Sequence, residues 1–210
     1  MKNVSSKTIG MIQVALFAAL IIIMASTPLG YIPLGFMRAT IIHVPVILGS
    51  VLLGPKKGAI LGFIFGLTSF INNTMNPVVT SFVFTPFYSL GEFSGGFGSI
   101  IICFVPRILV GVLPYFVYRI LYHFMKNKKA GQTISLGAAG IVGSLTNTIL
   151  VMGMILLFFK DSYAAAREVS SDAIYGVIAT VIGINGVPEA IVAAIIVTFL
   201  GKILFRFVKS

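Results

Sequence analysis

Four polar side chains in or beside apolar segments have the chemistry of a ligand site. Arg107 lies within the apolar run 100–110, and Asn147 lies within a later apolar run. Asn72 and Asn73 stand where a third apolar run ends. A guanidinium binds a carboxylate through two parallel hydrogen bonds, and an amide both donates and accepts hydrogen bonds. Together these residues suit a small anionic ligand that also carries hydroxyl or amide groups.

Each of these residues also has a purely structural interpretation. A guanidinium that faces lipid near the bilayer centre costs about 2.5–3.5 kcal/mol, so Arg107 must face the protein interior, a water-filled cavity or the outer interface. There it could pair with Glu92 or Glu189, or extend to the interface, instead of binding a ligand. Asn147 could join two helices, and the other two asparagines are of a type common at helix ends. The sequence leaves both interpretations open.

The sequence contains none of the clusters that metal binding or catalysis usually needs. Cys103 is the single cysteine, and His43 and His123 are 80 residues apart, so neither a disulfide nor a local metal site is predicted. No glycine-rich phosphate loop, zinc-protease motif or pair of acids within an apolar run is present. Glu189 follows Pro188 at the expected start of a helix, where an acid complements the helix dipole, and we interpret it as structural. We therefore expect a protein that is not an enzyme and has no metal or cofactor.

The composition indicates that the bilayer is the solvent of this chain. Hydrophobic residues make up 58 % of the 210 residues, charged residues make up 10 %, and the mean hydropathy is +1.07. A soluble fold of this size could not cover its surface with so few charges. The net charge of +10 would indicate nucleic acid in a soluble protein, but here its placement along the chain matters more, and no nucleic acid partner is expected.

Six apolar runs are candidates to cross the hydrocarbon core, which takes about 20 helical residues. They cover residues 8–28, 40–54, 58–73, 100–124, 134–159 and 188–207. The second is short, and a stretch that could lie at the membrane interface precedes it. The first has no small-residue cleavage site at its end, so we interpret it as a retained span and not as a signal peptide. The predicted fold is all-α: one membrane domain, residues 1–210, of six transmembrane helices.

The basic residues give these six spans a consistent orientation. Eleven of the 15 fall on one side: Lys2, Lys7, Lys56, Lys57, Arg119, Lys126, Lys128, Lys129, Lys202, Arg206 and Lys209. The positive-inside rule puts that side, and with it both termini, in the cytoplasm. Arg38, Lys160 and Arg167 fall on the other side with most of the acids, and Arg107 remains in or near the membrane. A multi-pass protein of a bacterial-type plasma membrane is expected.

Two predicted outer connections, residues 74–99 and 160–187, are each over 25 residues long. Long ordered loops are usually functional. The first mixes Pro and Gly with aromatic residues, Tyr88 among them, and could cover a ligand pocket as a lid that contacts the ligand. Alternatively, these aromatic residues form an interfacial belt that only anchors the protein.

Small residues form one face of the first predicted span. Ala15 and Ala19 are one helical turn apart, and Ala18 and Ala25 lie nearby in the sequence. Small residues at i and i+4 let two helices approach closely. The partner helix could belong to this chain or to another protein.

The second and third predicted spans carry a family resemblance. The run IHVPVILGSVLLGPKKGA at 42–59, its continuation GFIFGLTSFINNT at 62–74 and the segment SFVFTP at 81–86 resemble the substrate-binding S components of energy-coupling factor (ECF) transporters. Six spans in about 200 residues and the alanine pair fit the same family. The segments 62–74 and 81–86 are most similar to its pantothenate branch.

The resemblance implies a vitamin-binding membrane subunit without enzymatic activity or a motor of its own. In the family, an alanine-containing face of the first helix docks on a transmembrane T subunit, which two cytoplasmic ATPases drive, and the S component topples in the membrane with its substrate. Ala15 and Ala19 match that docking motif, and Arg107 and Asn147 match polar substrate contacts of the pantothenate branch. One arginine and several asparagines complement the carboxylate, the amide and the two hydroxyls of pantothenate.

Three other functions stay open on the sequence alone. An S component for another metabolite or vitamin, such as a thiamine precursor or a cobalamin-type compound, would share these features. A self-contained secondary transporter commonly has internal repeats, and the two halves of this sequence show no convincing similarity. An intramembrane enzyme would need acids or histidines at depth, and these do not cluster here.

Overall fold

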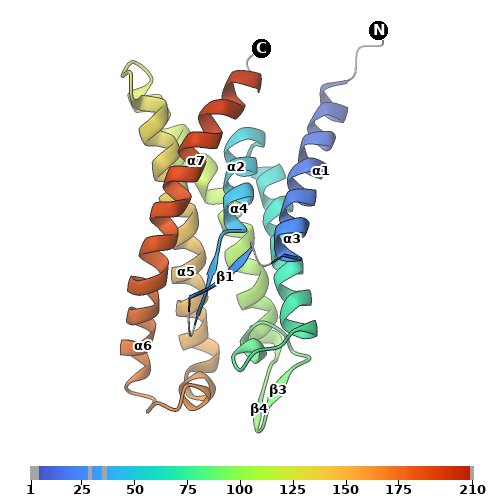
Figure 1. The fold of residues 1–210 in the computed structure, drawn as a ribbon, viewed down its shortest axis with the longest axis vertical. Helices are drawn as coiled ribbons and strands as arrows, with labels where there is room; N and C mark the ends of the chain where they lie inside the picture. The colour runs from blue at the N-terminus through green and yellow to red at the C-terminus, as the bar shows by residue number, and fades with distance from the viewer. Residues whose placement is uncertain (1–4, 28–29, 35–36, 209–210) are drawn as a thin grey trace.

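The computed structural model of the chain describes residues 5–27, 30–34 and 37–208, and it is a bundle of long helices (Figure 1). Its elements are, in chain order, α1 (Ser6–Ala25), β1 (Tyr31–Leu34), β2 (Met37–Thr40), α2 (His43–Leu53), α3 (Pro55–Met75), the 3₁₀-helix η1 (Ser81–Val83), β3 (Ser89–Leu90), β4 (Phe93–Ser94), α4 (Phe97–Met125), α5 (Gly131–Ala166), α6 (Ile174–Val181), the π-helix η2 (Ile182–Gly186) and α7 (Val187–Val208). The strands form two short antiparallel hairpins, β1–β2 and β3–β4. The fold is that of an all-α membrane protein.

Among the described residues, five helical segments are long and apolar enough to cross a membrane. They are Lys7–Ala25, Pro55–Met75, Phe97–Met125, Gly131–Ala166 and Ile174–Arg206. The last of these runs through α6, η2 and α7 without a break. Each segment overlaps one of the predicted spans.

The predicted span 40–54 contains α2, an apolar helix of only 11 residues. A helix of this length rises about 16 Å, roughly half of the hydrocarbon core. Every residue from His43 to Val51 is buried, and α2 contacts α1, α3, α4, α5 and α7. Gly54 alone separates α2 from α3, and its φ of +93° is a backbone conformation that favours glycine. The short helix is therefore enclosed by the others, which explains why it is apolar on all sides.

The predicted long connection 160–187 is wrong. The helix α5 continues through a kink at Phe159, where φ is −138°, and ends at Ala166. Since α6 begins at Ile174, only residues 167–173 connect the two helices. The π-helix η2 then carries the chain from α6 into α7, so Pro188 lies inside a continuous helical segment and does not start one. A π-turn just before a proline accommodates the missing backbone N–H.

The connection between α3 and α4 is long, as the sequence predicts, but it is structured. It contains η1 and the hairpin β3–β4, with Ser89 opposite Ser94 and Leu90 opposite Phe93. Phe82 and Val83 of η1 are fully buried in a cluster with residues of α4, α5 and α6. The segment is thus fastened to one end of the bundle.

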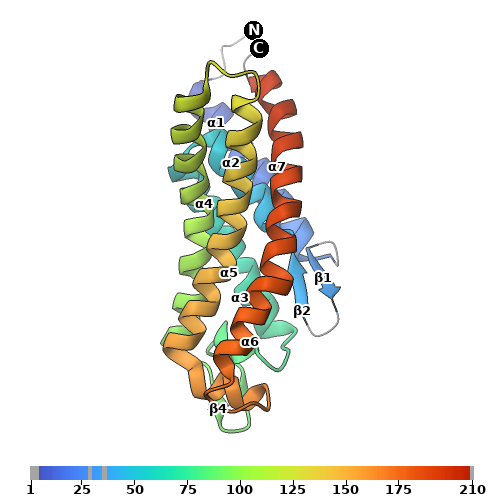
Figure 2. The same cartoon turned by 90° about the vertical axis from the view of Figure 1, so that its left-hand side faces the viewer.

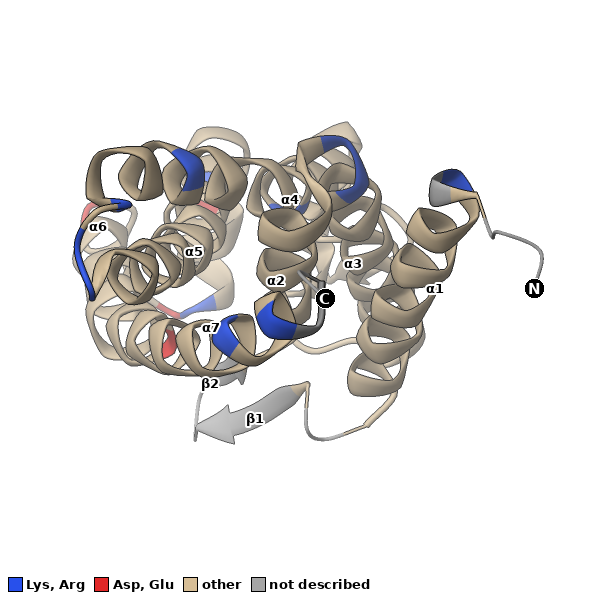
Figure 3. Cartoon of the chain, turned by 90° about the horizontal axis from the view of Figure 1, so that it is seen from above, with Lys and Arg blue, Asp and Glu red and all other residues tan. Residues whose placement is uncertain are grey.

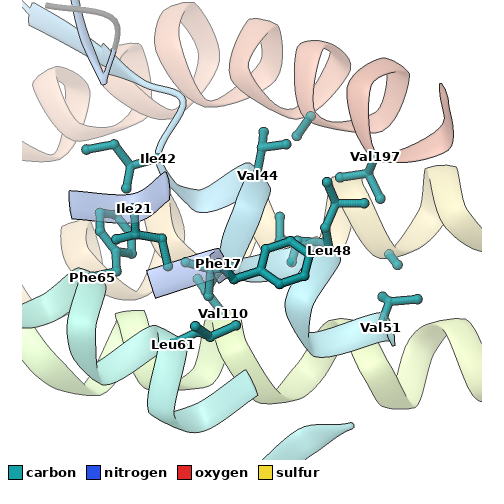
Figure 4. Close-up of a cluster of buried hydrophobic side chains, with 14 of the residues drawn as sticks. Phe17, Ile21, Ile42, Val44, Leu48, Val51, Leu61, Phe65, Val110 and Val197 are labelled. Carbon is teal, nitrogen blue, oxygen red and sulfur yellow. The ribbon is translucent and has the colours of Figure 1, made fainter. Parts of the chain in front are cut away.

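A second hydrophobic cluster surrounds α2 (Figure 4). Phe17 and Ile21 of α1 reach it from one side, Leu61 and Phe65 of α3 from another, and Val197 of α7 completes it. The remaining face of α1 is open, because this helix packs chiefly on α2 and α3.

Glycines allow α3 and α4 to touch along their backbones. Gly58 faces Gly111, and Gly62 faces the carbonyl group of Arg107. Gly66, one turn further along α3, lies against Cys103 and the next residue of α4. Small residues at i, i+4 and i+8 are typical of close helix contacts in membranes. This contact sets the position of Arg107 relative to α3.

The beginning of the first helix and the end of the last lie at the same end of the bundle (Figures 1 and 2). Figure 3 shows from above that Lys and Arg lie at the start of α1 and near the end of α7. In the sequence these positions hold Lys7, Lys202 and Arg206. The start of α3, with Lys56 and Lys57, and the basic turn between α4 and α5 are at this end too (Figure 1). The hairpin β3–β4 and the α5–α6 connection, which carry most of the acids, lie at the opposite end.

Candidate ligand-binding site

A cavity of about 820 Å³ opens in the half of the bundle away from the chain ends. The end of α3, the middle of α4, α5, and the junction of α6 with α7 surround it. Its lining consists of Thr40, Ser69, Asn72, Asn73, Val78, Val79, Thr80, Phe84, Arg107, Asn147, Thr148, Val151, Met152, Ile155, Tyr163, Ala166, Arg167, Glu168, Val181, Asn185 and Glu189. This volume lies within the range of small-molecule sites, about 300–1,000 Å³.

Arg107 lines this cavity and is only 7 % exposed. Its Nη1 donates to the Ile102 carbonyl over 2.8 Å, and its Nη2 donates to the Ser69 hydroxyl over 3.4 Å. The preceding residue, Pro106, lacks the N–H that would otherwise bond to that same Ile102 carbonyl in the helix. The proline therefore leaves free the acceptor that holds the arginine.

Two aromatic rings lie on the guanidinium of Arg107. Its Cζ is 5.6 Å from the ring centroid of Phe65 and 5.1 Å from that of Phe84. Both distances are those of a cation–π contact. These rings fix the plane of the guanidinium, which suits it to the two-point binding of a carboxylate.

Asn147 brings an available acceptor to the cavity. It is 9 % exposed, and its Oδ1 has no hydrogen-bond partner among the described residues. A buried amide oxygen without a partner costs about 1–3 kcal/mol, so a ligand that donates a hydrogen bond here recovers this free energy. Thr148, the next residue, also lines the cavity, and its hydroxyl donates to the Ser144 carbonyl over 3.4 Å.

The two asparagines at the end of α3 line the cavity as well, but they also hold the chain in place. Asn73 donates to the Ser69 carbonyl over 2.8 Å and accepts from the Ser81 hydroxyl over 2.9 Å. Asn72 accepts from the side chain of Asn76 over 3.3 Å. Asn73 thus joins the end of α3 to η1, and both the ligand and the helix-end interpretations apply at this position.

Glu189, which the sequence suggests is only structural, lines the cavity. Its Oε1 accepts the backbone N–H of Thr40 over 2.8 Å, across 149 residues of sequence. This bond fastens the end of the β1–β2 hairpin to α7. The sequence signal was present, because an ionisable residue inside a membrane span is by default a candidate functional residue. Pro188 conceals this signal, because it suggests a helix start at which an acid is common.

A second arginine, which the sequence analysis places only in an outer loop, stands at the rim of the cavity. Arg167 donates from Nη2 to the Tyr163 hydroxyl over 3.1 Å, and its Cζ lies 5.4 Å from the centroid of that ring. Glu168, which has a positive φ of 56°, lines the same rim. Asn185 of η2 also lines the cavity, and the sequence did not indicate it because the helical path through 174–187 was not predicted.

The cavity also has a substantial apolar wall. Val151, Met152 and Ile155 of α5, Val181 of α6 and Phe84 contribute to it. Together with two arginines, two acids and four asparagines, this wall suits a small ligand with an anionic group, hydrogen-bonding groups and a branched apolar part. A guanidinium such as that of Arg107 binds a carboxylate through paired hydrogen bonds.

The remaining predicted site residues lie elsewhere. Tyr88 is half-buried and packs against the hydrophobic cluster of η1, but it does not line the cavity. Ala15 and Ala19 are exposed on the open face of α1. Exposed large apolar side chains, Ile12 at 61 % and Leu16 at 63 %, flank them.

The fold and this cavity define a class: an α-helical, multi-pass membrane protein with a solute-sized polar cavity between its helices. The chain belongs to the family of substrate-specific components of ECF transporters, because the model described as "ECF transporter, substrate-specific component" matches residues 10–201. This confirms the resemblance seen in the second and third spans. The protein is thus a transporter component of the cell membrane.

Two curated relatives agree with that family. The chain is 39 % identical over 163 residues to a protein named "Pantothenic acid transporter PanT" from Lactococcus lactis subsp. cremoris (strain MG1363). The aligned region covers 77 % of this chain and 75 % of the relative. It is 26 % identical over 211 residues to "Pantothenate transporter PanT" from Leuconostoc mesenteroides subsp. mesenteroides. Here the aligned region covers 95 % of this chain and 94 % of the relative.

Proposed function

We propose that this protein is the pantothenate-binding S component of an ECF transporter and that it binds the vitamin in the cavity around Arg107 without catalysing a reaction. The observation that carries the proposal is a buried arginine that bonds to the Ile102 carbonyl and the Ser69 hydroxyl and contacts two aromatic rings in a cavity of about 820 Å³. The names of the two relatives support pantothenate as the ligand.

The groups of pantothenate match the lining of the cavity. Its carboxylate binds the Arg107 guanidinium, and its hydroxyl and amide groups bond to Asn147 and to the asparagines at the end of α3. Its two geminal methyl groups lie against the apolar wall of α5. Tyr88 holds the β3–β4 hairpin beside the cavity instead of touching the ligand, and this hairpin with η1 covers the cavity from outside.

We propose that the chain is one domain with six crossings, of which α2 is the short one, and with both termini in the cytoplasm. The collection of basic residues at the end where α1 begins and α7 ends supports this orientation. The cavity then opens toward the outside of the cell. This is the side from which a vitamin is captured.

Energy for uptake comes from other subunits in this proposal. The open face of α1, with Ala15 and Ala19 between large apolar side chains, docks on a transmembrane T subunit that two cytoplasmic ATPases drive. The exposure of both alanines supports docking to another protein over packing within the chain.

The test is binding of labelled pantothenate to the purified chain in detergent without ATP, for the unaltered protein and for Arg107→Ala. Removing one partner of a buried charge pair, here the guanidinium that binds the carboxylate, costs about 2 kcal/mol or more. Kd for pantothenate is therefore expected to rise by roughly 30-fold or more in Arg107→Ala. Arg119→Ala removes an exposed arginine from the other end of the same helix and should leave Kd unchanged.

Pantothenyl alcohol, which replaces the carboxylate by a hydroxyl, makes this test specific. The unaltered protein should bind it far more weakly than pantothenate, whereas Arg107→Ala should bind the two compounds about equally. Equal pantothenate affinity of Arg107→Ala and the unaltered protein would refute the carboxylate assignment. Binding of a thiamine precursor or a cobalamin-type compound in place of pantothenate would identify an S component for another vitamin.

A further inference from the structure

A second hollow lies on α4 at the end of the bundle where the chain begins and ends. It has a volume of about 270 Å³, and it is lined by Phe116, Arg119, Ile120, His123 and Phe124. All five residues belong to the last three turns of one helix and are exposed. We call this surface the α4 groove. It is separate from the ligand cavity, which α4 lines only through Arg107.

Two kinds of side chain run along the α4 groove in parallel. Phe116, Ile120 and Phe124 are four residues apart and form an apolar stripe, with exposed fractions of 46 %, 56 % and 78 %. Arg119 and His123, also four residues apart, form a basic stripe next to it. Lys126 caps the helix and continues the basic stripe.

No carboxylate of the chain stands near the α4 groove in the sequence. The five acids are Glu92, Asp161, Glu168, Asp172 and Glu189, so α4, the α4–α5 turn and the adjoining ends of the other helices contain none. The described hydrogen bond of Arg119 is to a neutral group, the Tyr115 hydroxyl, over 2.8 Å. The ring of the same tyrosine lies 5.8 Å from the guanidinium carbon. The groove therefore presents positive charge toward an external anion.

We infer that the α4 groove is a binding site for an anionic phospholipid, with the headgroup phosphate on the basic stripe and an acyl chain along the apolar stripe. Guanidinium and ammonium groups are strong phosphate donors. Basic pockets at the cytoplasmic ends of membrane helices are suited to anionic headgroups. This inference does not depend on the ligand of the main cavity.

The apolar stripe favours a lipid over free phosphate. A phosphate ion would contact only Arg119, His123 and Lys126 and would make no contact with the apolar stripe. A phospholipid joins a phosphate to a hydrocarbon chain, so one molecule can contact the basic stripe and the adjacent apolar stripe at the same time. The match between both halves of the groove and both halves of one molecule is the basis of the proposal.

The test is native mass spectrometry of the purified chain with equal amounts of dioleoyl phosphatidylglycerol and dioleoyl phosphatidylcholine. The unaltered protein should retain phosphatidylglycerol preferentially. The double variant Arg119→Gln, Lys126→Gln should lose this preference by roughly 30-fold, because each basic residue near an anionic lipid surface contributes about fivefold and the two contributions multiply. The matched control Lys56→Gln, Lys202→Gln removes two exposed charges from the same end of the bundle and should keep it.

Three results would overturn the proposal. Equal losses in the two double variants would mean that the whole basic end attracts the lipid and that the α4 groove is not a site. Displacement of bound phosphatidylglycerol by excess inorganic phosphate would mean that the groove binds the anion alone. The groove would instead bind a protein partner if two results came together. The unaltered protein would show no preference between the two lipids, and the Arg119→Gln, Lys126→Gln variant would fail to co-purify with other transporter subunits.

Discussion

The replacement Gly62→Ala tests whether the close contact of α3 with α4 holds Arg107 in position. A Cβ atom at residue 62 would overlap the carbonyl oxygen of Arg107 and would lie 2.8 Å from the Cα of Ile108. All of these are backbone atoms of α4, so no change of side-chain rotamer relieves the overlap. The two helices must instead move apart by several tenths of an ångström.

Two terms of opposite sign set the size of the effect on stability. Overpacking of a well-packed contact typically costs about 1–3 kcal/mol. Alanine gains up to about 1 kcal/mol over glycine in a helix interior, so we expect a net loss of about 1–2 kcal/mol in the free energy of unfolding.

The effect on the site is of similar size. The bond from Arg107 Nη2 to the Ser69 hydroxyl is already 3.4 Å long, and a small separation of α3 from α4 breaks it. When the Arg107 guanidinium moves away from the asparagines of α3, the guanidinium and the asparagines can no longer bind the same ligand molecule at once. We expect Kd for pantothenate to rise about tenfold, which corresponds to about 1.4 kcal/mol.

The assay is a thermal unfolding curve in detergent together with calorimetric binding of pantothenate. Gly153→Ala is the matched control, because Gly153 lies on α5 and nothing stands within 4 Å of its added Cβ. That variant should keep its affinity and melt at the same or a higher temperature. If Gly62→Ala and Gly153→Ala behave alike in both measurements, the α3–α4 contact does not position Arg107.

Three further changes probe other parts of the proposal. Ala15→Leu and Ala19→Leu should bind pantothenate normally and abolish its uptake by cells, and uptake retained in both would place the docking surface elsewhere. Asn147→Leu should weaken pantothenate binding about two- to tenfold, because it removes one neutral hydrogen bond to the ligand. It should not lower the melting temperature, because the amide oxygen that it removes has no partner in the described structure. Glu189→Gln keeps an acceptor for the Thr40 N–H and removes a negative charge from the cavity. Calorimetry should therefore show tighter binding of pantothenate. Weaker binding would mean that the Glu189 carboxylate itself holds a hydroxyl of the ligand.

Composition and hydropathy were sufficient to predict the all-α membrane fold, because few charges and long apolar runs permit little else in a bilayer. The same reasoning singled out Arg107 and Asn147, which are polar groups at depth and whose burial has to be explained. The structure brings both of them, with Asn72 and Asn73, to one cavity. Rare polar residues in apolar surroundings were therefore the most informative signal.

Local signals failed where the structure departs from common helix rules. Pro188 is of a type favoured in the first turn of a helix, so it suggested that one begins there, whereas η2 lets the helix continue through it. Asn185 lies in the unpredicted segment 174–187 and so had no predicted role, whereas Glu189 was interpreted as a residue of a helix start. The bond from Thr40 to Glu189 joins residues 149 positions apart, and neither spacing nor composition predicts such a pairing.

One face of α3 explains why the cavity opens at the end of the bundle away from the chain ends. Along this face the residues at 58, 62 and 66 are glycines, and the next two at helical spacing are Ser69 and Asn73. Where the glycines stand, the backbones of α3 and α4 touch, and no space is left between them. Past Gly66 the side chains become larger and polar, so the helices can no longer touch, and the space between them is lined by hydrogen-bonding groups. The helix face that closes the bundle at one end therefore opens it at the other, and Arg107 lies at the boundary, where its own carbonyl still meets Gly62 while its guanidinium reaches Ser69.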